Sequence, residues 1–263
     1  MFGAIIGDVV GSPYEFDSHK KKNFPLFGEE CRLTDDSILT ICVGSACAEA
    51  DITDEDGFKK VLIEKMHEIA RRYPDAGYGG LFYAWLFDDY GKPYNGFTNG
   101  SAMRVSPCAW ACDTLEDVCR LAKWSAEITH SHPDGVKGAV AVASAIFLAR
   151  TGSSKEEIRE YIEDNFYSLN FTLDEIRPGY SHDMTCEGSV PQALACFLEA
   201  EDFEDALRNA VSLGGDGDTL SAIAGSVAEA YFGIPDELKD EVLNLMDDFL
   251  SEYFLDYTEY LYR

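Results

Sequence analysis

One segment near the middle of the chain constrains the fold more than any other. Residues 134–150 read DGVKGAVAVASAIFLAR, so small apolar side chains occupy nearly every position of this run. A helix that is apolar on all sides must be covered by neighbouring elements on all sides. Strand signals are few, because Gly11 and Pro13 interrupt residues 9–16 and no hairpin turn joins two alternating runs. The covering elements are therefore expected to be helices.

Apolar residues recur at helical spacing elsewhere, which predicts an all-α chain of about ten helices. The segments with this pattern are 57–73, 114–130, 154–165, 188–200, 203–213, 219–231 and 236–255. The acidic end of the chain, residues 247–259, mixes in aromatic side chains and is expected to be an amphipathic helix. No shift in composition or linker divides the sequence. We predict a compact single-domain helical bundle over residues 1–263.

The charge of the chain excludes several classes of partner. With 21 Lys and Arg against 48 Asp and Glu, the formal net charge is −27. Phosphate backbones and anionic membranes repel such a protein, so general nucleic-acid and membrane binding are not expected. The first ten residues lack the basic residue of a signal peptide, and the eight cysteines form no C-x-x-C pair. These features predict a cytoplasmic protein with reduced thiols.

Two acidic segments precede apolar helical runs. They are Thr34-Asp35-Asp36-Ser37 and Gly214-Gly215-Asp216-Gly217-Asp218-Thr219. Asp and Thr can simply cap a helix, but one carboxylate is enough for that, and two close carboxylates repel each other unless a cation or proton intervenes. Together the segments offer four carboxylates and two hydroxyls. Such oxygen ligands suit one or two Mg²⁺ or Mn²⁺ ions, which would also let this acidic chain bind an anionic ligand.

Three further segments carry polar residues with open roles. Residues 7–15 are glycine-rich and contain Asp8, for which a structural hydrogen-bonding role is considered, and Glu15, a surface residue or a general base. Residues 98–104 can form a turn or cradle an anion with backbone N–H groups. In residues 129–133, His130 and His132 could be ligands, a base, a stacking surface or helix caps.

The order of these motifs resembles the ADP-ribosylglycohydrolase family, which includes the dinitrogenase-reductase-activating glycohydrolase and the ADP-ribosyl-acceptor hydrolases. The motifs are G-D-x-x-G-x-x-x-E, T-D-D-S, N-G-S-A-M-R, T-H-S-H-P and G-G-D-G-D-T, and the matching segments span residues 3–235. The resemblance implies a compact all-α bundle around a dinuclear metal site that holds two Mg²⁺ or Mn²⁺ ions.

The resemblance also implies roles for individual residues. The implied metal ligands are Thr34, Asp35, Asp36, Asp216, Asp218 and Thr219. Glu15 matches the mobile acidic position beside the bond that is cleaved. The residues that match the loop holding the diphosphate and distal ribose are Asn99, Gly100, Ser101, Ala102, Met103 and Arg104. His130, rather than His132, matches the histidine that contacts substrate.

The function implied is hydrolysis of the glycosidic bond between ADP-ribose and a protein side chain or small molecule, with release of ADP-ribose. We hypothesise that the cations bind hydroxyls of the distal ribose and that the anomeric carbon develops oxocarbenium character. Either Glu15 or Asp35 would orient or deprotonate the attacking water. The sequence leaves the acceptor open among arginine, serine and smaller groups.

Two other readings of the sequence are possible. His182-Asp183 could belong to a metal phosphohydrolase of the HD type, which needs several histidine ligands. That reading leaves the acidic segments unexplained. The other alternative is a family member that binds ADP-ribose, or serves a structural purpose, without catalysis.

Overall fold

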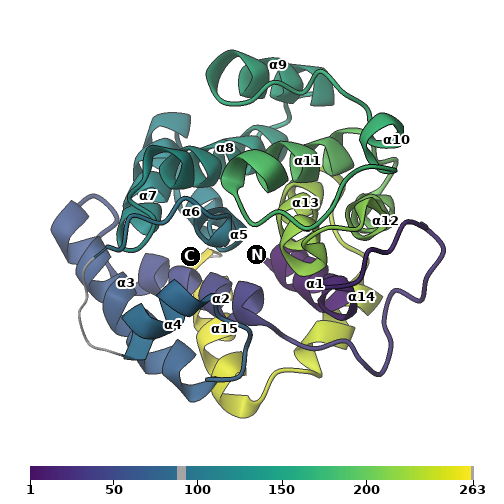
Figure 1. The fold of residues 1–263 in the computed structure, drawn as a ribbon. Helices are drawn as coiled ribbons and strands as arrows, with labels where there is room; N and C mark the ends of the chain where they lie inside the picture. The colour runs from purple at the N-terminus through teal and green to yellow at the C-terminus, as the bar shows by residue number, and fades with distance from the viewer. Residues whose placement is uncertain (88–92, 262–263) are drawn as a thin grey trace.

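The protein is helical throughout the part of the chain that the structure describes. The computed structural model describes residues 1–87 and 93–261, which form fifteen α-helices, two 3-10 helices and one isolated antiparallel bridge, Thr98 to Thr185 (Figure 1). This confirms the all-α prediction. The helices are α1 (Phe2–Gly11), η1 (Ser12–Tyr14), α2 (Asp35–Glu49), α3 (Glu55–Ile69), η2 (Ala70–Arg72), α4 (Gly80–Phe87), α5 (Gly100–Met103), α6 (Ser106–Ala111), α7 (Leu115–Glu127), α8 (Pro133–Arg150), α9 (Lys155–Asn165), α10 (Leu173–Ile176), α11 (Cys186–Leu198), α12 (Phe203–Leu213), α13 (Gly217–Phe232), α14 (Asp236–Leu243) and α15 (Asp248–Leu261).

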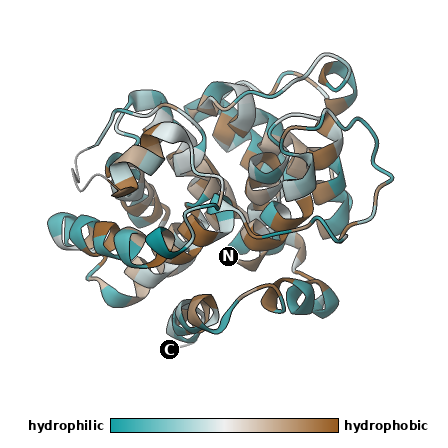
Figure 2. Cartoon of the chain, turned by 60° about the horizontal axis from the view of Figure 1, so that its bottom comes forward, coloured by the Kyte–Doolittle hydropathy of each residue, from teal (hydrophilic) through white to brown (hydrophobic). Residues whose placement is uncertain are grey.

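The apolar run that most constrains the fold forms α8, and other helices cover it as expected. Helices α5, α6, α7, α11 and α13 all pack against it. Buried apolar residues from the first helix to the last join into one hydrophobic core. Figure 2 shows hydrophobic segments gathered on the inner helices, while the connecting segments are mostly hydrophilic. The division of the sequence into a single domain stays a prediction.

Helices α1 and α13 lie side by side in the middle of the molecule (Figure 1). Glycines at every fourth position of α1 make this contact possible. A Cβ atom on Gly7 would overlap the backbone carbonyl of Ser221, and one on Gly11 would overlap the carbonyl of Gly217. The absence of side chains lets the two backbones touch. This contact sets the distance between the polar residues at the ends of the two helices.

The glycine-rich residues 7–15 are mostly helical and do not form a loop. Residues 2–11 form α1 and only Ser12–Tyr14 form a short 3-10 helix. Glycine weakens an isolated helix, but here the glycines face α13 and their close packing stabilises the helical form. The short helices α4, α5, α6 and α10 were also not predicted, which accounts for the larger number of helices.

The predicted helix over residues 236–255 is two helices, α14 and α15. They are separated at residues 244–247, where the Asp247 side chain accepts a hydrogen bond from the Leu250 backbone N–H (2.8 Å) and so caps the start of α15. The amphipathic character predicted for this end of the chain is confirmed. Phe254 and Tyr257 are buried against the body of the protein, and the Tyr257 hydroxyl donates to the Pro107 carbonyl at 3.0 Å.

Two further expectations concern the whole chain. All eight cysteines are free, as expected for reduced thiols. Across the described ranges, none of the helices combines the length and the apolar character that crossing a membrane requires.

Candidate functional site

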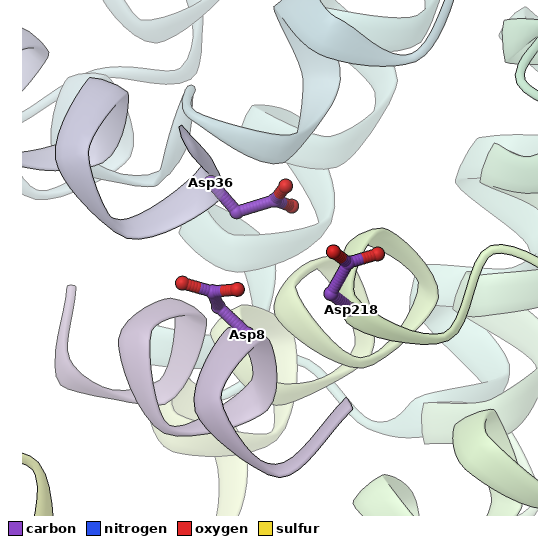
Figure 3. A group of neighbouring side chains, drawn as sticks. All are labelled: Asp8, Asp36 and Asp218. Atoms are coloured by element: carbon purple, nitrogen blue, oxygen red, sulfur yellow. The ribbon is translucent and has the colours of Figure 1, made fainter. Parts of the chain in front are cut away.

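Three aspartates from distant parts of the sequence meet where α1, α2 and α13 converge. Asp8, Asp36 and Asp218 each offer a carboxylate oxygen, and these oxygens lie within 4.8 Å of one another. Figure 3 shows the three side chains pointing toward a common point from three helices. All three are buried, with at most 3% of their surface exposed. Three carboxylates do not gather in a protein interior without a source of positive charge or protons.

A second group of carboxylates shares one member with the first. Glu15, Asp216 and Asp218 also offer oxygens within 4.8 Å of one another. Asp218 therefore lies between two clusters of hard oxygen ligands. The sequence predicted that its two acidic segments meet, and the structure shows this for Asp36, Asp216 and Asp218. Two clusters joined in this way are suited to two neighbouring divalent cations.

The local sequence explains why these side chains lie at helix starts. Thr34 is the N-cap of α2, where its hydroxyl oxygen accepts from the Asp36 backbone N–H at 3.4 Å. Asp216 occupies the N-cap position of α13 and follows Gly214, which has a φ of +69° and ends α12. The left-handed conformation favours glycine at this position. Both helices thus direct their positive N-terminal ends toward the carboxylates.

Asp8, in the last turns of α1, binds the start of α2. It accepts hydrogen bonds from the backbone N–H of Thr34 (2.9 Å) and of Ser37 (3.1 Å), and from both of their hydroxyl groups. Oδ2 accepts three of these bonds and Oδ1 accepts the one from the Thr34 hydroxyl. The structural hydrogen-bonding role considered for Asp8 is confirmed. Asp8 was missing from the predicted acidic site, although the glycines four residues apart around it were a signal for a helix.

The other carboxylates of the first group have unmet bonding capacity. Asp36 Oδ2 accepts from Thr219 Oγ1 at 3.4 Å, but its Oδ1 is buried without a hydrogen-bond partner. Asp218 Oδ1 accepts from the Thr219 N–H at 2.8 Å. Within residues 1–87 and 93–261, no lysine or arginine forms an ion pair with Asp36 or Asp218. Burial and the neighbouring carboxylates hold the pKa of both groups well above the ordinary range. A buried oxygen without a donor is costly, so these residues fit a bound cation.

Asp35 lies beside the two groups and belongs to neither of them. It is half-buried, and its backbone N–H donates to the Ala76 carbonyl at 2.9 Å. Burial, with the charge of Asp8 as a second cause, raises the pKa of its carboxyl to about 8. Asp35 is therefore able to carry a proton at neutral pH.

Glu15 is the most exposed carboxylate of the two groups, with 18% of its side chain exposed. It follows η1 and lies 3.9 Å from the Arg32 guanidinium. Burial and the charge of Asp216 raise its pKa. The neighbouring chain lines a cavity of about 600 Å³, whose walls are Ser12, Pro13, Phe16, Asp17, Glu30 and Arg32. Glu15 itself is not among these walls, although its sequence neighbours Ser12, Pro13 and Phe16 are.

The segment 99–104 reaches the acidic site at two of its residues. Asn99 Nδ2 donates to Asp216 Oδ2 at 2.8 Å, and Met103 Sδ lies 3.8 Å from Thr219 Oγ1. The remaining side chains of the segment point into the core. Ser101 donates to the Gly135 carbonyl, Ala102 is fully buried, and Arg104 is fully buried with hydrogen bonds to Ser125 and Thr129.

The two histidines of residues 129–133 have different environments. His130 is 2% exposed, and both ring nitrogens are hydrogen-bonded, Nδ1 to Thr129 Oγ1 (2.8 Å) and Nε2 to Thr98 Oγ1 (3.0 Å). Burial, with the nearby Arg104 charge, lowers its pKa to about 3. His132 is the N-cap of α8 and accepts from the Asp134 N–H at 3.2 Å. Neither carboxylate group contains a histidine, so the geometry does not support the HD reading.

Comparison with known proteins identifies the family. The model of the ADP-ribosylglycohydrolase family matches residues 1–262. ADP-ribosylhydrolase ARH3 of Homo sapiens is 27% identical over 89% of this chain and 84% of its own length. ADP-ribosylarginine hydrolase Tri1 of Pseudomonas putida is 25% identical over 89% of this chain and 70% of its own length.

A solved structure also shares the fold. It is described as an ADP-ribosylglycohydrolase-related protein complex, and it aligns with a TM-score of 0.69 and 23% identity over the whole of this chain and 96% of that one. The match to the family model over nearly the full length, including both acidic segments, shows that this chain belongs to the ADP-ribosylglycohydrolase family.

Proposed function

We propose that this protein is a metal-dependent hydrolase that cleaves the glycosidic bond between ADP-ribose and an acceptor, releasing ADP-ribose. The observation that carries the proposal is the pair of carboxylate groups joined at Asp218. Membership of the family and the names of its relatives indicate a hydrolase of ADP-ribose linkages. The substrate is either an ADP-ribosylated protein or an ADP-ribosylated small molecule.

By the family resemblance, the residues that would hold two Mg²⁺ or Mn²⁺ ions are Thr34, Asp35, Asp36, Asp216, Asp218 and Thr219. Of these, Asp36, Asp216 and Asp218 belong to the two carboxylate groups. The unpartnered Oδ1 of Asp36 and the oxygen-only character of the set support a hard divalent cation. When bound, the cations supply positive charge that can hold the oxygens of a hydroxyl-rich, anionic ligand in this acidic site. Asp8 is not among the proposed ligands, because its four hydrogen bonds tie it to the start of α2.

Hydrolysis breaks the bond between the anomeric carbon and the acceptor, and a water oxygen takes the acceptor's place. The water must lose a proton and the acceptor must gain one. Glu15 and Asp35 are the two candidates to accept the water proton, because each has a raised pKa and is only partly buried. Glu15 is favoured, since it belongs to the second carboxylate group and 18% of its side chain is exposed.

Substrate binding is assigned to residues 99–104 and His130. Asn99, which donates to Asp216, is the member of this segment whose side chain is bonded to the carboxylates. Arg104 and His130 are too deeply buried for direct contact and would act by supporting exposed neighbours.

The test is release of ADP-ribose from ADP-ribosylated arginine and serine peptides with Mg²⁺, with Mn²⁺ or with excess EDTA. We expect metal-dependent release from one of them, which would also name the acceptor. The double variant Asp216→Asn with Asp218→Asn should lose both turnover and Mn²⁺ binding. Asp240→Asn, which neutralises an exposed carboxylate on α14, is the matched control. Metal-dependent binding of ADP-ribose without turnover on either peptide would favour the non-catalytic alternative.

A further inference from the structure

A chain of hydrogen bonds leads from a buried arginine to the edge of the acidic site. Arg104 Nη2 donates to Thr129 Oγ1 at 2.8 Å, Thr129 Oγ1 lies 2.8 Å from His130 Nδ1, and His130 Nε2 lies 3.0 Å from Thr98 Oγ1. The first three residues are buried and Thr98 is half-buried. Thr98 directly precedes Asn99, whose amide donates to Asp216. The chain therefore ends beside the carboxylates.

The donor at the buried end limits the directions that the chain can take. A guanidinium group can only donate, so Thr129 Oγ1 is an acceptor toward Arg104. Thr129 then either donates its hydroxyl hydrogen to His130 Nδ1 or accepts a second hydrogen from it, and the tautomer of the ring decides which. A neutral histidine that accepts at Nδ1 carries its hydrogen on Nε2, which donates to Thr98 Oγ1. Burial and the nearby Arg104 charge, which lower the pKa of His130, keep the ring neutral.

The imidazole ring is also held in place by its packing. A Cβ atom on Gly96 would lie 2.7 Å from His130 Cδ2, and one on Gly100 would lie 3.2 Å from His130 Nε2. A Cβ atom on Gly135 would lie 3.0 Å from the Cβ of His130. With backbone against it on several sides, the ring has no room to swing out toward a ligand.

We propose that His130 carries its hydrogen on Nε2 and is a positioning residue, which holds the Thr98 hydroxyl as a hydrogen-bond donor to an oxygen of the bound ADP-ribosyl group. In this tautomer Thr98 Oγ1 receives the hydrogen of His130, and no described residue accepts the hydrogen of Thr98 itself. Because Thr98 is half-exposed, this hydrogen is available to a ligand. The proposal rests on the proposed function for the identity of the ligand, but the direction of the hydrogen bonds does not depend on it.

The first test measures the protonation of the ring in the ligand-free, full-length protein. Nitrogen NMR of uniformly labelled protein at neutral pH reports which histidine nitrogen carries hydrogen, and His130→Gln assigns the signals. We expect hydrogen on Nε2 and none on Nδ1. In Thr129→Val, which removes the donor to Nδ1, a mixture of the two tautomers is expected. A cationic ring, or hydrogen on Nδ1 in the unmodified protein, would overturn the proposal.

The second test measures the effect of Thr98 on ADP-ribose binding by calorimetry with Mn²⁺ present. Losing one hydrogen bond to a ligand oxygen should weaken binding roughly tenfold in Thr98→Val, whereas Thr98→Ser should bind like the unmodified protein. The affinity for Mn²⁺ alone should be the same in all three. Thr98→Val with unchanged ADP-ribose affinity would refute the role of Thr98.

The two tests separate failure of this inference from failure of the proposed function. His130→Gln, which keeps a side-chain N–H donor, should bind ADP-ribose better than His130→Leu, which has none. A merely structural histidine would not show this rescue. If the unmodified protein binds no ADP-ribose, the proposed function and the ligand assigned to Thr98 both fail. The nitrogen spectrum still decides the direction of the hydrogen bonds.

Discussion

Gly7 on α1 lies against the backbone carbonyl of Ser221 on α13, with no space for a side chain between them. The next residue along α1 is Asp8, and one turn before Ser221 lies Asp218. The backbone contact between the two helices therefore determines how closely these two carboxylates approach. A substitution at Gly7 should therefore alter both the packing of the two helices and the spacing of the two carboxylates.

Gly7→Ala should destabilise the protein and weaken its metal binding together. Forcing a methyl group into this contact costs about 1–3 kcal/mol of the free energy of unfolding, since the helices must separate. Chemical denaturation and Mn²⁺ calorimetry measure the two effects. Gly28→Ala is the control, because a Cβ atom there meets nothing within 4 Å. A stable Gly7→Ala protein with unchanged Mn²⁺ affinity would show that the contact does not position the carboxylates.

Asp36→Asn should stabilise the metal-free protein while abolishing tight metal binding. The raised pKa of Asp36 means that its charged form is disfavoured in the folded state, so the penalty is present above the folded pKa and relieved as pH falls. In EDTA at alkaline pH, we expect a gain of about 1–3 kcal/mol from the neutral amide, shrinking in acid. Saturating Mn²⁺ should reverse the order of stability. Denaturation with and without metal checks this, and a less stable metal-free variant would contradict it.

His130 should make the protein less stable as the pH falls. Its pKa is lowered from 6.5 to about 3 by burial and by Arg104, so below 6.5 the unfolded chain takes up a proton that the folded chain does not. Over that range the free energy of unfolding should fall by up to about 1.4 kcal/mol per pH unit from this group. His130→Gln should remove this part of the slope. Parallel slopes for the variant and the unmodified protein would show that His130 is not held neutral.

Glu15→Gln should still bind ADP-ribose but turn over some 10²- to 10⁴-fold more slowly, the usual contribution of a general base. Steady-state kinetics and calorimetry separate the two effects. Glu29→Gln, which neutralises an exposed glutamate outside both carboxylate groups, is the matched control. Full activity of Glu15→Gln would transfer the role to Asp35, which Asp35→Asn would then test.

Lys20→Met should weaken Mn²⁺ binding, although the Lys20 ammonium donates to backbone carbonyls and not to a carboxylate of the site. The Lys20 ammonium donates to the carbonyls of Tyr180, Leu213 and Gly214, and so holds the turn that leads into Asp216. We expect the affinity for Mn²⁺ to fall several-fold, because the turn loses the hydrogen bonds that the Lys20 ammonium donates to its carbonyls. Lys21→Met, at an exposed position, is the control. Equal Mn²⁺ affinity in the two variants would show that the turn holds its shape without Lys20.

Much of this arrangement could be predicted from local sequence. The apolar run of α8 required covering helices, and the aromatic residues of α15 required a surface to pack on, as Phe254 and Tyr257 show. The repulsion within each acidic segment indicated a cation or a proton, and the two segments do meet at Asp36, Asp216 and Asp218. These inferences depend on hydrophobicity and charge, which are properties of individual residues and can be recognised in the sequence.

The features that were not predicted depend on contacts between distant segments. A helix with glycine at every fourth position is weak by itself, and only the backbone of α13 makes α1 stable. The adjacent Asp35 and Asp36 look equivalent in the sequence. In the first turn of α2 they point in different directions, so only Asp36 joins Asp8 and Asp218. That choice is set by how α2 is rotated relative to its neighbours.

Asp218 belongs to both carboxylate groups, so occupancy of one group cannot leave the other unaffected. A cation bound in one group partly neutralises Asp218 and so changes the charge available to a cation in the other group. The two binding equilibria are therefore thermodynamically linked. The protein would then respond to divalent cations as a coupled pair rather than as two separate sites. With such coupling, the binding curve of the fraction of protein with both groups occupied has a shape that two independent sites would not produce.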